Sequence, residues 1–322
     1  MKIAVVGCRG FGTVHLRALS DIRKRKDIEV YVFSRDETAA KNCMKEFQAK
    51  GYFTKFDSVL ESEVNIIDLV VSHDEHMRMG LEAINSGKHV MLEKPIARNL
   101  QEADALISTA NEKKVKFMVL ENFYFDTSVW KAKELIEKIK PLSLILVRDL
   151  RLNKVKGWRT NYEMMGNGSL IDGGIHFVDT MLNLGGEYKE VKGMCKRTFA
   201  GIEGEDTSGA IFDFGDYLGM LTYSWAARNP PPVPAFEIYG EKGTIVEDPK
   251  SREAGKPFGD LIFNGERIVV EKMNPVVREI EGFIDAVEKG KTVPMDPYIA
   301  RRDLEAVLKI YEGCEQGAHE NK

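Results

Sequence analysis

The first twelve residues, MKIAVVGCRGFG (residues 1–12), decide the fold of the N-terminal part of the chain. The β-branched run at residues 2–7 predicts a buried strand, and a helix is expected to open directly after the glycines. A strand, a glycine-rich turn and a helix in this order are typical of a β-α-β unit, whose helix N-terminus binds the pyrophosphate of a dinucleotide. The turn residues expected at the cofactor are Gly7, Arg9, Gly10, Phe11 and Gly12.

This turn departs from the usual fingerprint G-x-G-x-x-G. The second glycine of that motif lets the backbone approach the pyrophosphate, whereas here Arg9 stands in its place and Gly10 follows one position later. Taken alone, the imperfect motif leaves a purely structural turn open. Its position between a first strand and a first helix makes a dinucleotide site the stronger interpretation.

The segment from residue 1 to about 122 alternates short β-branched runs with stretches of helical period. This alternation predicts a parallel, doubly wound α/β sheet of the Rossmann type. One helix is expected over residues 74–85, because Gly87 is placed to end it. The expected strands are residues 2–7, 28–33, 65–72, 89–93 and 116–120.

Beyond about residue 140 the runs become longer and are joined by tight turns, which favours an antiparallel meander. We therefore predict two domains, a cofactor-binding Rossmann domain at 1–122 and an α+β domain at 123–322 that binds substrate and supports oligomerisation through a largely antiparallel open sheet. Two amphipathic helices are expected to close the chain. The expected strands are residues 142–152, 190–198, 207–214, 217–225, 235–239 and 244–246.

The end of the second strand bears on the choice of cofactor. Enzymes that use NAD place an acidic residue there for the adenosine ribose, but this chain has Ser34 and Arg35. A hydroxyl and a guanidinium suit the 2′-phosphate of NADP, and Arg9 adds a second cation. Asp36 is the alternative ribose acid. Its position also suits the cap of the next helix, so NADP is predicted over NAD.

Two further motifs carry a family resemblance. Residues 87–95, GKHVMLEKP, with His76 upstream, and residues 166–179, GNGSLIDGGIHFVD, resemble the signatures of the glucose-fructose oxidoreductase, inositol dehydrogenase and rhizopine-catabolism protein (Gfo/Idh/MocA) family. The resemblance implies that Lys94, Asp172 and His176 meet beside the nicotinamide. Ser72, His76, Glu93 and Lys94 are expected among the cofactor-binding residues.

Elementary chemistry agrees with these roles. Ligands of open α/β sheets bind outside the carboxyl ends of the strands, where Lys94 stands. Oxidation of an alcohol requires removal of the hydroxyl proton, which suits the imidazole of His176, and Lys94 could stabilise the alkoxide. Asp172 precedes His176 by four residues and could orient its ring. Whether the Lys94–Pro95 peptide is cis cannot be read from the sequence.

The sequence defines the substrate-binding residues less clearly than the cofactor-binding residues. The segment at residues 121–127 resembles a family motif whose centre is often basic, but Phe123 and Tyr124 stand there. Arg159 could bind a hydroxyl, carboxylate or phosphate, although a loop packed around Trp158 is an equal alternative. The candidate substrate residues are Asn122, Tyr124, Trp158, Arg159 and Tyr162.

Composition excludes several other classes of protein. The chain has 322 residues, 43% hydrophobic and 30% charged, with a net charge of −4, so it gives no electrostatic reason to expect a nucleic-acid partner. No run approaches the roughly 18 apolar residues of a membrane span, and the strand begins too early for a signal peptide. Four scattered cysteines predict reduced thiols, no spacing suggests a metal site, and we expect a cytoplasmic protein without a membrane partner.

These observations predict an NAD(P)-dependent oxidoreductase, with NADP preferred, that acts on CH–OH groups of a sugar, polyol or related compound. Two alternatives stay open. One is an NAD-dependent glycosidase of the same superfamily, and the other is a non-catalytic regulator that senses NADP. An open antiparallel sheet is commonly covered by self-association, so a homodimer or homotetramer is expected through the C-terminal sheet.

Overall fold

The computed structural model describes residues 1–319. It forms two compact units, the first made of Met1–Glu121 with Asn274–Arg301 and the second of Asn122–Met273 with the chain from Arg302 onward. The single division at residue 122 differs from these units, because the segment 274–301 returns to the first. The assignment of cofactor binding to 1–122 and substrate binding to 123–322 remains a proposal.

The first unit is built on a parallel sheet of six strands in the order β3-β2-β1-β4-β5-β6, which confirms the doubly wound Rossmann arrangement. Its strands are β1 (Lys2–Val6), β2 (Glu29–Phe33), β3 (Gly51–Phe53), β4 (Ile66–Leu69), β5 (His89–Glu93) and β6 (Phe117–Leu120). Three of the five expected strands are one residue shorter than predicted, β4 has half its expected length, and β5 matches. The sequence did not predict β3, because three residues are too few to show a period.

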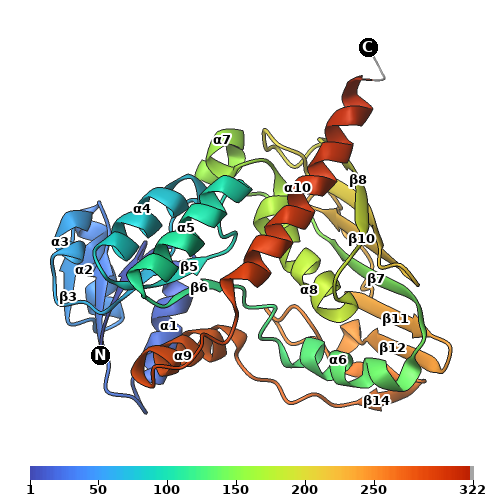
Figure 1. Cartoon of the computed structure of the whole chain (residues 1–322), viewed down its shortest axis with the longest axis horizontal. Helices are drawn as coiled ribbons and strands as arrows, with labels where there is room; N and C mark the ends of the chain where they lie inside the picture. Colours follow the sequence, from blue (N-terminus) through green and yellow to red (C-terminus); the bar gives the residue numbers. More distant parts are fainter. Residues whose placement is uncertain (320–322) are drawn as a thin grey trace. The chain divides into compact units, whose positions relative to one another are not determined.

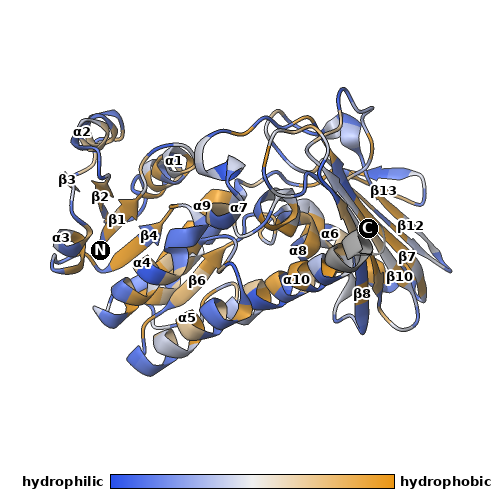
Figure 2. Ribbon diagram, turned by 90° about the horizontal axis from the view of Figure 1, so that it is seen from above, coloured by the Kyte–Doolittle hydropathy of each residue, from blue (hydrophilic) through white to orange (hydrophobic). Residues whose placement is uncertain are grey.

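Helices cover this sheet, and its strands are strongly hydrophobic between them (Figure 2). Helix α4 packs against α5, and α1 packs against α9. Gly87, with a φ of 72°, follows the C-terminus of α4 as expected. The helices are α1 (Gly12–Ile22), α2 (Glu37–Glu46), α3 (Phe56–Leu60), α4 (His73–Asn85), α5 (Leu100–Lys113) and α9 (Pro275–Glu288).

Ion pairs explain why the late helix α9 belongs to the first unit. The Arg25 guanidinium lies 2.7 Å from the Glu281 carboxylate, and the Lys26 ammonium pairs with Asp285. The buried Ile280 and Phe283 supply apolar contact on the same helix. The basic run at residues 23–26 therefore binds α9 at two of its four positions.

The second unit contains an eight-stranded open sheet in the order β14-β13-β12-β11-β7-β10-β9-β8 (Figure 1). All of its pairs are antiparallel except β7 with β10, so the expected meander is interrupted once. Helix α8 packs on β7 and β10, and α6 on β11 and β12. The strands are β7 (Leu142–Leu150), β8 (Glu190–Lys196), β9 (Thr207–Asp213), β10 (Leu218–Ser224), β11 (Phe236–Gly240), β12 (Gly243–Glu247), β13 (Leu261–Phe263) and β14 (Glu266–Ile268).

This unit contains three long helices and several short helical turns. The long ones are α6 (Thr127–Ile139), α8 (Ile175–Gly185) and α10 (Pro297–His319), of which the residues from Arg302 belong to this unit. The short ones are η1 (Gly157–Thr160), α7 (Tyr162–Met165), the π-helical turn η2 (Leu170–Gly174) and η3 (Pro249–Ser251). None of the helices within residues 1–319 has the length and apolarity needed to span a membrane.

The structure contradicts the expectation that the four cysteines are reduced thiols. The structure joins Cys8 to Cys43 and Cys195 to Cys314 as disulfides, with Cα atoms 6.3 and 5.1 Å apart. The partners are separated by 35 and 119 residues in the sequence, so no short spacing announces them. Packing of α2 beside the glycine turn, and of α10 beside β8, brings each pair together.

Candidate active site

The turn between β1 and α1 requires glycine at positions where a side chain would overlap the backbone. A Cβ at Gly7 would lie 2.0 Å from the Val70 carbonyl oxygen, and one at Gly12 would lie 1.8 Å from the Gly7 carbonyl oxygen. Gly10 instead has a φ of 58° and open space around it, so its conformation is what requires glycine. Gly10 thus supplies a left-handed turn one position later than the usual motif, which explains how Arg9 is tolerated.

The end of β2 carries the residues expected to choose the cofactor. Asp36 caps α2, since its carboxylate accepts hydrogen bonds from the backbone N–H groups of Thr38 and Ala39 at 3.0 and 3.2 Å. This confirms its expected capping role. The same carboxylate lies 3.6 Å from the exposed Arg9 guanidinium, while Arg35 is exposed and the Ser34 hydroxyl accepts from the Asp36 N–H.

Lys94 follows the last residue of β5, and its peptide bond to Pro95 is cis. His76 lies beside this turn on α4. Its Nδ1 is 2.8 Å from the Pro95 carbonyl oxygen and its Nε2 is 3.3 Å from that of Val71. Burial lowers the pKa of His76 to about 3, so the ring is neutral and has one N–H to donate.

The structure places His76 against the Lys94–Pro95 turn, and its expected contact with the cofactor remains a prediction. The side chain has no exposed surface, and its ring nitrogens face backbone carbonyls. It holds the Lys94–Pro95 turn in place. Ser72, also expected at the cofactor, is the N-cap residue of α4, but its side chain makes no capping hydrogen bond.

A buried ionic cluster beneath the Lys94 turn was not predicted. His15 on α1 has no exposed surface, and its Nδ1 lies 2.9 Å from the Asp68 carboxylate of β4 while its Nε2 lies 2.9 Å from the Glu93 carboxylate of β5. Although burial lowers the pKa of His15, the two carboxylates outweigh it and raise that pKa well above its usual value. His15 is thus a positively charged imidazolium that pairs with one carboxylate from each of two strands.

Glu279 on α9 completes this cluster. It is fully buried, and its carboxyl oxygens have no hydrogen-bond partner among the described residues. Burial raises its pKa well above the usual value, and the carboxylates of Glu93, Glu121 and Asp68 add to the shift. Glu279 is therefore a neutral acid. The sequence signal for the cluster was a set of charged residues at otherwise apolar positions of strands and helices.

Asp172 and His176 lie at the junction of η2 and α8. Asp172 is 3% exposed, and its carboxylate accepts a hydrogen bond from the Arg159 Nε at 2.8 Å. The half-buried His176 ring stacks on Phe123, with ring centroids 4.4 Å apart and planes at 17°. The π-helical turn replaces the regular helix start that the four-residue spacing suggested, and such turns are frequent at functional sites.

The structure does not bring the expected substrate residues together in one place. Arg159 lies over the Trp158 ring, 4.3 Å from its centroid, and reaches Asp172, so these three form one cluster. Tyr124 instead packs edge-on against Trp130 and accepts that indole's N–H through its carbonyl. The other members of the set are Asn122, half-buried in the same turn, and Tyr162, 44% exposed on α7.

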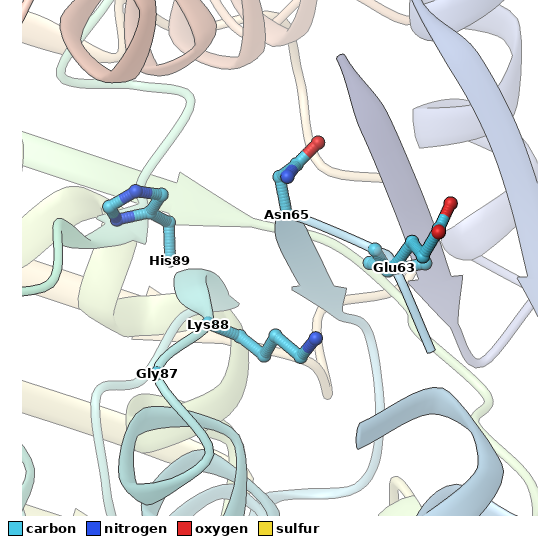
Figure 3. A pocket seen from close by; sticks show the side chains of 6 residues that line it. Glu63, Asn65, Gly87, Lys88 and His89 are labelled. Carbon is cyan, nitrogen blue, oxygen red and sulfur yellow. The ribbon is translucent and has the colours of Figure 1, made fainter. Parts of the chain in front are cut away.

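A polar pocket of about 390 Å³ lies at the amino ends of strands in the parallel sheet, away from the Lys94 turn at their carboxyl ends (Figure 3). Its lining includes Asn65, Lys88 and His89, which stand at the amino ends of β4 and β5. The Lys88 ammonium donates to the Ser62 carbonyl oxygen at 2.7 Å. Open sheets bind cofactors at the carboxyl ends of their strands, so this pocket is not the cofactor site. Among the side chains that the structure describes, residues 1–314, no cluster could hold a metal ion.

Comparison with known proteins places this geometry in a family. A model of the oxidoreductase family with an NAD-binding Rossmann fold matches residues 1–121, and a model of the GFO/IDH/MocA C-terminal domain matches residues 142–246. The scyllo-inositol 2-dehydrogenase (NADP(+)) IolU of Bacillus subtilis is 25% identical over 310 residues, covering 90% of this chain and 89% of that protein. The uncharacterized protein YMR315W of Saccharomyces cerevisiae is 28% identical over 61% of this chain, a stretch that covers only 58% of the yeast protein.

Solved structures agree on the fold. An oxidoreductase from Thermotoga maritima superposes with a TM-score of 0.87 at 25% identity, covering 97% of this chain and 96% of that one. A levoglucosan dehydrogenase in complex with NADH and levoglucosan gives a TM-score of 0.85 at 18% identity, covering 98% and 97%. The sheet order, the two matched domains and these likenesses lead to one conclusion: the chain belongs to the Gfo/Idh/MocA oxidoreductase family.

Proposed function

We propose that this protein oxidises a CH–OH group of a sugar or polyol, or reduces the matching carbonyl, with a nicotinamide cofactor. The observation that carries the proposal is the buried Asp172 carboxylate, held by Arg159 at the helical junction that bears His176. The names of the inositol and levoglucosan dehydrogenases support the substrate class.

The glycine turn fits a dinucleotide. Gly7 and Gly12 allow backbone segments to approach at distances that a Cβ would fill, and the space beside Gly10 is open. A nicotinamide cofactor, when bound, accepts the hydride from the carbinol carbon. The residues that would hold it are those of the turn, Ser34, Arg35 and the Glu93–Lys94 strand end.

The side chains of the chain itself supply the proton chemistry. In the oxidation, His176 accepts the hydroxyl proton as the carbonyl forms, and Lys94 stabilises the developing alkoxide. Phe123 fixes the plane of the His176 ring by stacking. Asp172 and His176 lie in the second unit, whereas Lys94 lies in the first.

A substrate scan tests this function. Aldoses, polyols and inositols would be incubated with NADP and with NAD while the nicotinamide absorbance is followed. The proposal expects a substrate-dependent change in absorbance with at least one of them. Tight cofactor binding without any turnover across the scan would support the regulator instead, and product release without net change in absorbance would support the glycosidase.

We further propose NADP as the preferred cofactor, because Asp36 is engaged as a helix cap and faces Arg9 while Arg35 stays exposed. Arg35→Ala is expected to raise the Kd for NADP about tenfold, since one charge-assisted hydrogen bond to the 2′-phosphate is lost. The Kd for NAD should change little. Titration calorimetry measures both, with Arg17→Ala, an exposed arginine of α1, as the control. A wild-type protein that prefers NAD strongly would assign the ribose to Asp36.

We also propose that a second copy of the chain covers the open face of the C-terminal sheet. Gly219 on β10 faces Met181 of α8, so the alternate residue Met220 points to the other side. It pairs there with Ile211 of β9, and both are nearly half exposed, at 44% and 48%. Such an apolar face favours self-association.

The expected assembly is a dimer or a tetramer in light scattering. Met220→Lys places a charge at the centre of this face and should shift the protein toward monomers. Met273→Lys, at a methionine of similar exposure that lies outside the strands of this sheet, serves as the control. A wild-type protein that is already monomeric would contradict this proposal.

A further inference from the structure

The helical segment that carries Asp172 begins with three backbone N–H groups that converge on two residues. Ser169 N–H donates to the Glu205 carbonyl oxygen at 2.8 Å, and Leu170 N–H donates to the Glu205 Oε1 at 2.6 Å. Ile171 N–H donates to the Tyr311 hydroxyl at 3.0 Å, and that hydroxyl donates to the same Oε1 at 3.1 Å. The first N–H groups of a helix have no acceptor within it, so Glu205 and Tyr311 together form the cap.

The glycine turn before Asp172 is shaped to receive this cap. A Cβ at Gly168 would lie 1.9 Å from the Glu205 Oε2 and 2.2 Å from its carbonyl oxygen. A Cβ at Gly204 would lie 2.5 Å from the Gly168 Cα. The two segments therefore touch backbone to backbone. This contact gives Gly168, a glycine of the family motif, a role in bringing Glu205 to the helix start.

The cap contains a titratable group, the Glu205 carboxyl, which is buried and only partly hydrogen-bonded. Glu205 is 8% exposed, and its Oε2 has no hydrogen-bond partner among the described residues. Burial, reinforced by the neighbouring Asp206, raises the pKa of Glu205 to about 7 against the lowering effect of the Leu170 N–H and the Tyr311 hydroxyl. Asp206 itself accepts the N–H groups of Thr198 and Ala200, which lower its pKa. Tyr311 stays neutral, because burial and Glu205 raise its pKa well above the usual value.

We propose that Glu205 and Tyr311 are positioning residues that hold Asp172 and His176 in their working geometry through the backbone of residues 169–171. The inference rests on the proposed oxidoreductase function. Neither residue touches the reacting atoms in this assignment. Because the Glu205 carboxyl titrates near neutrality, gain of a proton changes the strength of the cap and thereby the placement of Asp172.

Two variants separate the geometry of the cap from its charge. Tyr311→Phe removes the acceptor of the Ile171 N–H, and kcat is expected to fall roughly 10–100-fold, as for other small misplacements of catalytic groups. Glu205→Gln keeps an oxygen for Leu170 and Tyr311 but cannot ionise. It should leave kcat within a few-fold at pH 6 and remove the inflection near pH 7 from the kcat profile. The Kd for the cofactor should be unchanged in both variants.

An experiment that needs no turnover tests the cap itself. The backbone ¹H–¹⁵N resonances of Leu170 and Ile171 should shift with pH with a midpoint near 7 in the wild-type protein and should not do so in Glu205→Gln. Glu203→Gln is the matched control, because Glu203 lies on the same loop and accepts the Tyr162 N–H at 2.8 Å. It should leave the midpoint unchanged.

The outcomes are distinguishable. Amide titration near pH 7 that Glu205→Gln abolishes supports the cap even if the substrate scan finds no turnover, in which case only the proposed function fails. Turnover in the wild-type protein combined with pH-independent amides overturns the inference. So does a Tyr311→Phe variant with unchanged kcat and unchanged pH profile.

Discussion

Replacing His176 by alanine is expected to lower turnover by roughly 10²–10⁴-fold, which is the usual contribution of a positioned acid or base. The imidazole accepts the hydroxyl proton in the proposed oxidation, and no neighbouring residue is assigned to replace it. Cofactor binding should be nearly intact, because the glycine turn and the β2 end lie in the other compact unit. Steady-state kinetics and calorimetric titration of the cofactor measure the two effects separately.

Two companion variants make the His176 result specific. His176→Gln keeps a polar side chain against Phe123 but supplies no base, so its loss of turnover should match that of alanine within a few-fold. His89→Gln changes a histidine at the amino end of β5 and should retain turnover. Turnover of either His176 variant within a few-fold of the wild-type value would show that the assignment of His176 as acid and base is wrong.

Replacing His15 by glutamine is expected to destabilise the protein by about 3–5 kcal/mol, because a buried charge pair loses one partner. The imidazolium donates to Asp68 on one side and to Glu93 on the other, each at 2.9 Å. A glutamine amide carries no positive charge and leaves both carboxylates uncompensated. Urea unfolding followed by far-ultraviolet circular dichroism measures the difference in the free energy of unfolding.

The pH dependence of this difference has a definite sign. The folded state raises the pKa of His15 above its ordinary value near 6.5, so its stabilising contribution is fully present below that value and is lost as pH rises through the folded pKa. The wild-type advantage over His15→Gln should therefore shrink at alkaline pH. The carboxyls that face the cluster are Asp68, Glu93, Glu121 and Glu279.

A double variant shows whether the loss comes from charge. Adding Glu93→Gln to His15→Gln removes one of the two uncompensated carboxylates, so the pair should be less destabilised than the sum of the single variants. Additive effects in this cycle would show that His15 stabilises the fold by packing and not by pairing. Circular dichroism of each variant establishes that the comparison is made between folded proteins.

Local patterns predicted much of the fold. The β-branched run before Gly7 and the apolar run before Lys94 are long enough to be recognised as buried strands, and both are found, as β1 and β5. Strands of three residues, such as β3 and β13, were missed because they show none. The return of α9 to the first unit was missed as well, since it depends on pairs such as Arg25 with Glu281 that are 256 residues apart.

The sequence likewise revealed only some residues of the candidate site. Asp172 and His176 were identified because residues 166–179 resemble a family signature, and their assignment as catalytic groups remains a proposal. The residues that support them were not found, because Glu205 meets Leu170 across 35 positions and Tyr311 across 106. A single buried histidine such as His15 is ordinarily a packed core residue, and only the two carboxylates brought to it by β4 and β5 give it a charge.

The direct test of the central claim is to follow the hydrogen itself. A substrate found in the scan would be prepared with deuterium on the carbinol carbon and converted by the wild-type enzyme, and the reduced cofactor would be analysed by mass spectrometry. Hydride transfer predicts one deuterium in the nicotinamide ring for each carbonyl product formed. Formation of product with the deuterium retained on the substrate carbon, or lost to water while the cofactor remains oxidised, would contradict the oxidoreductase account.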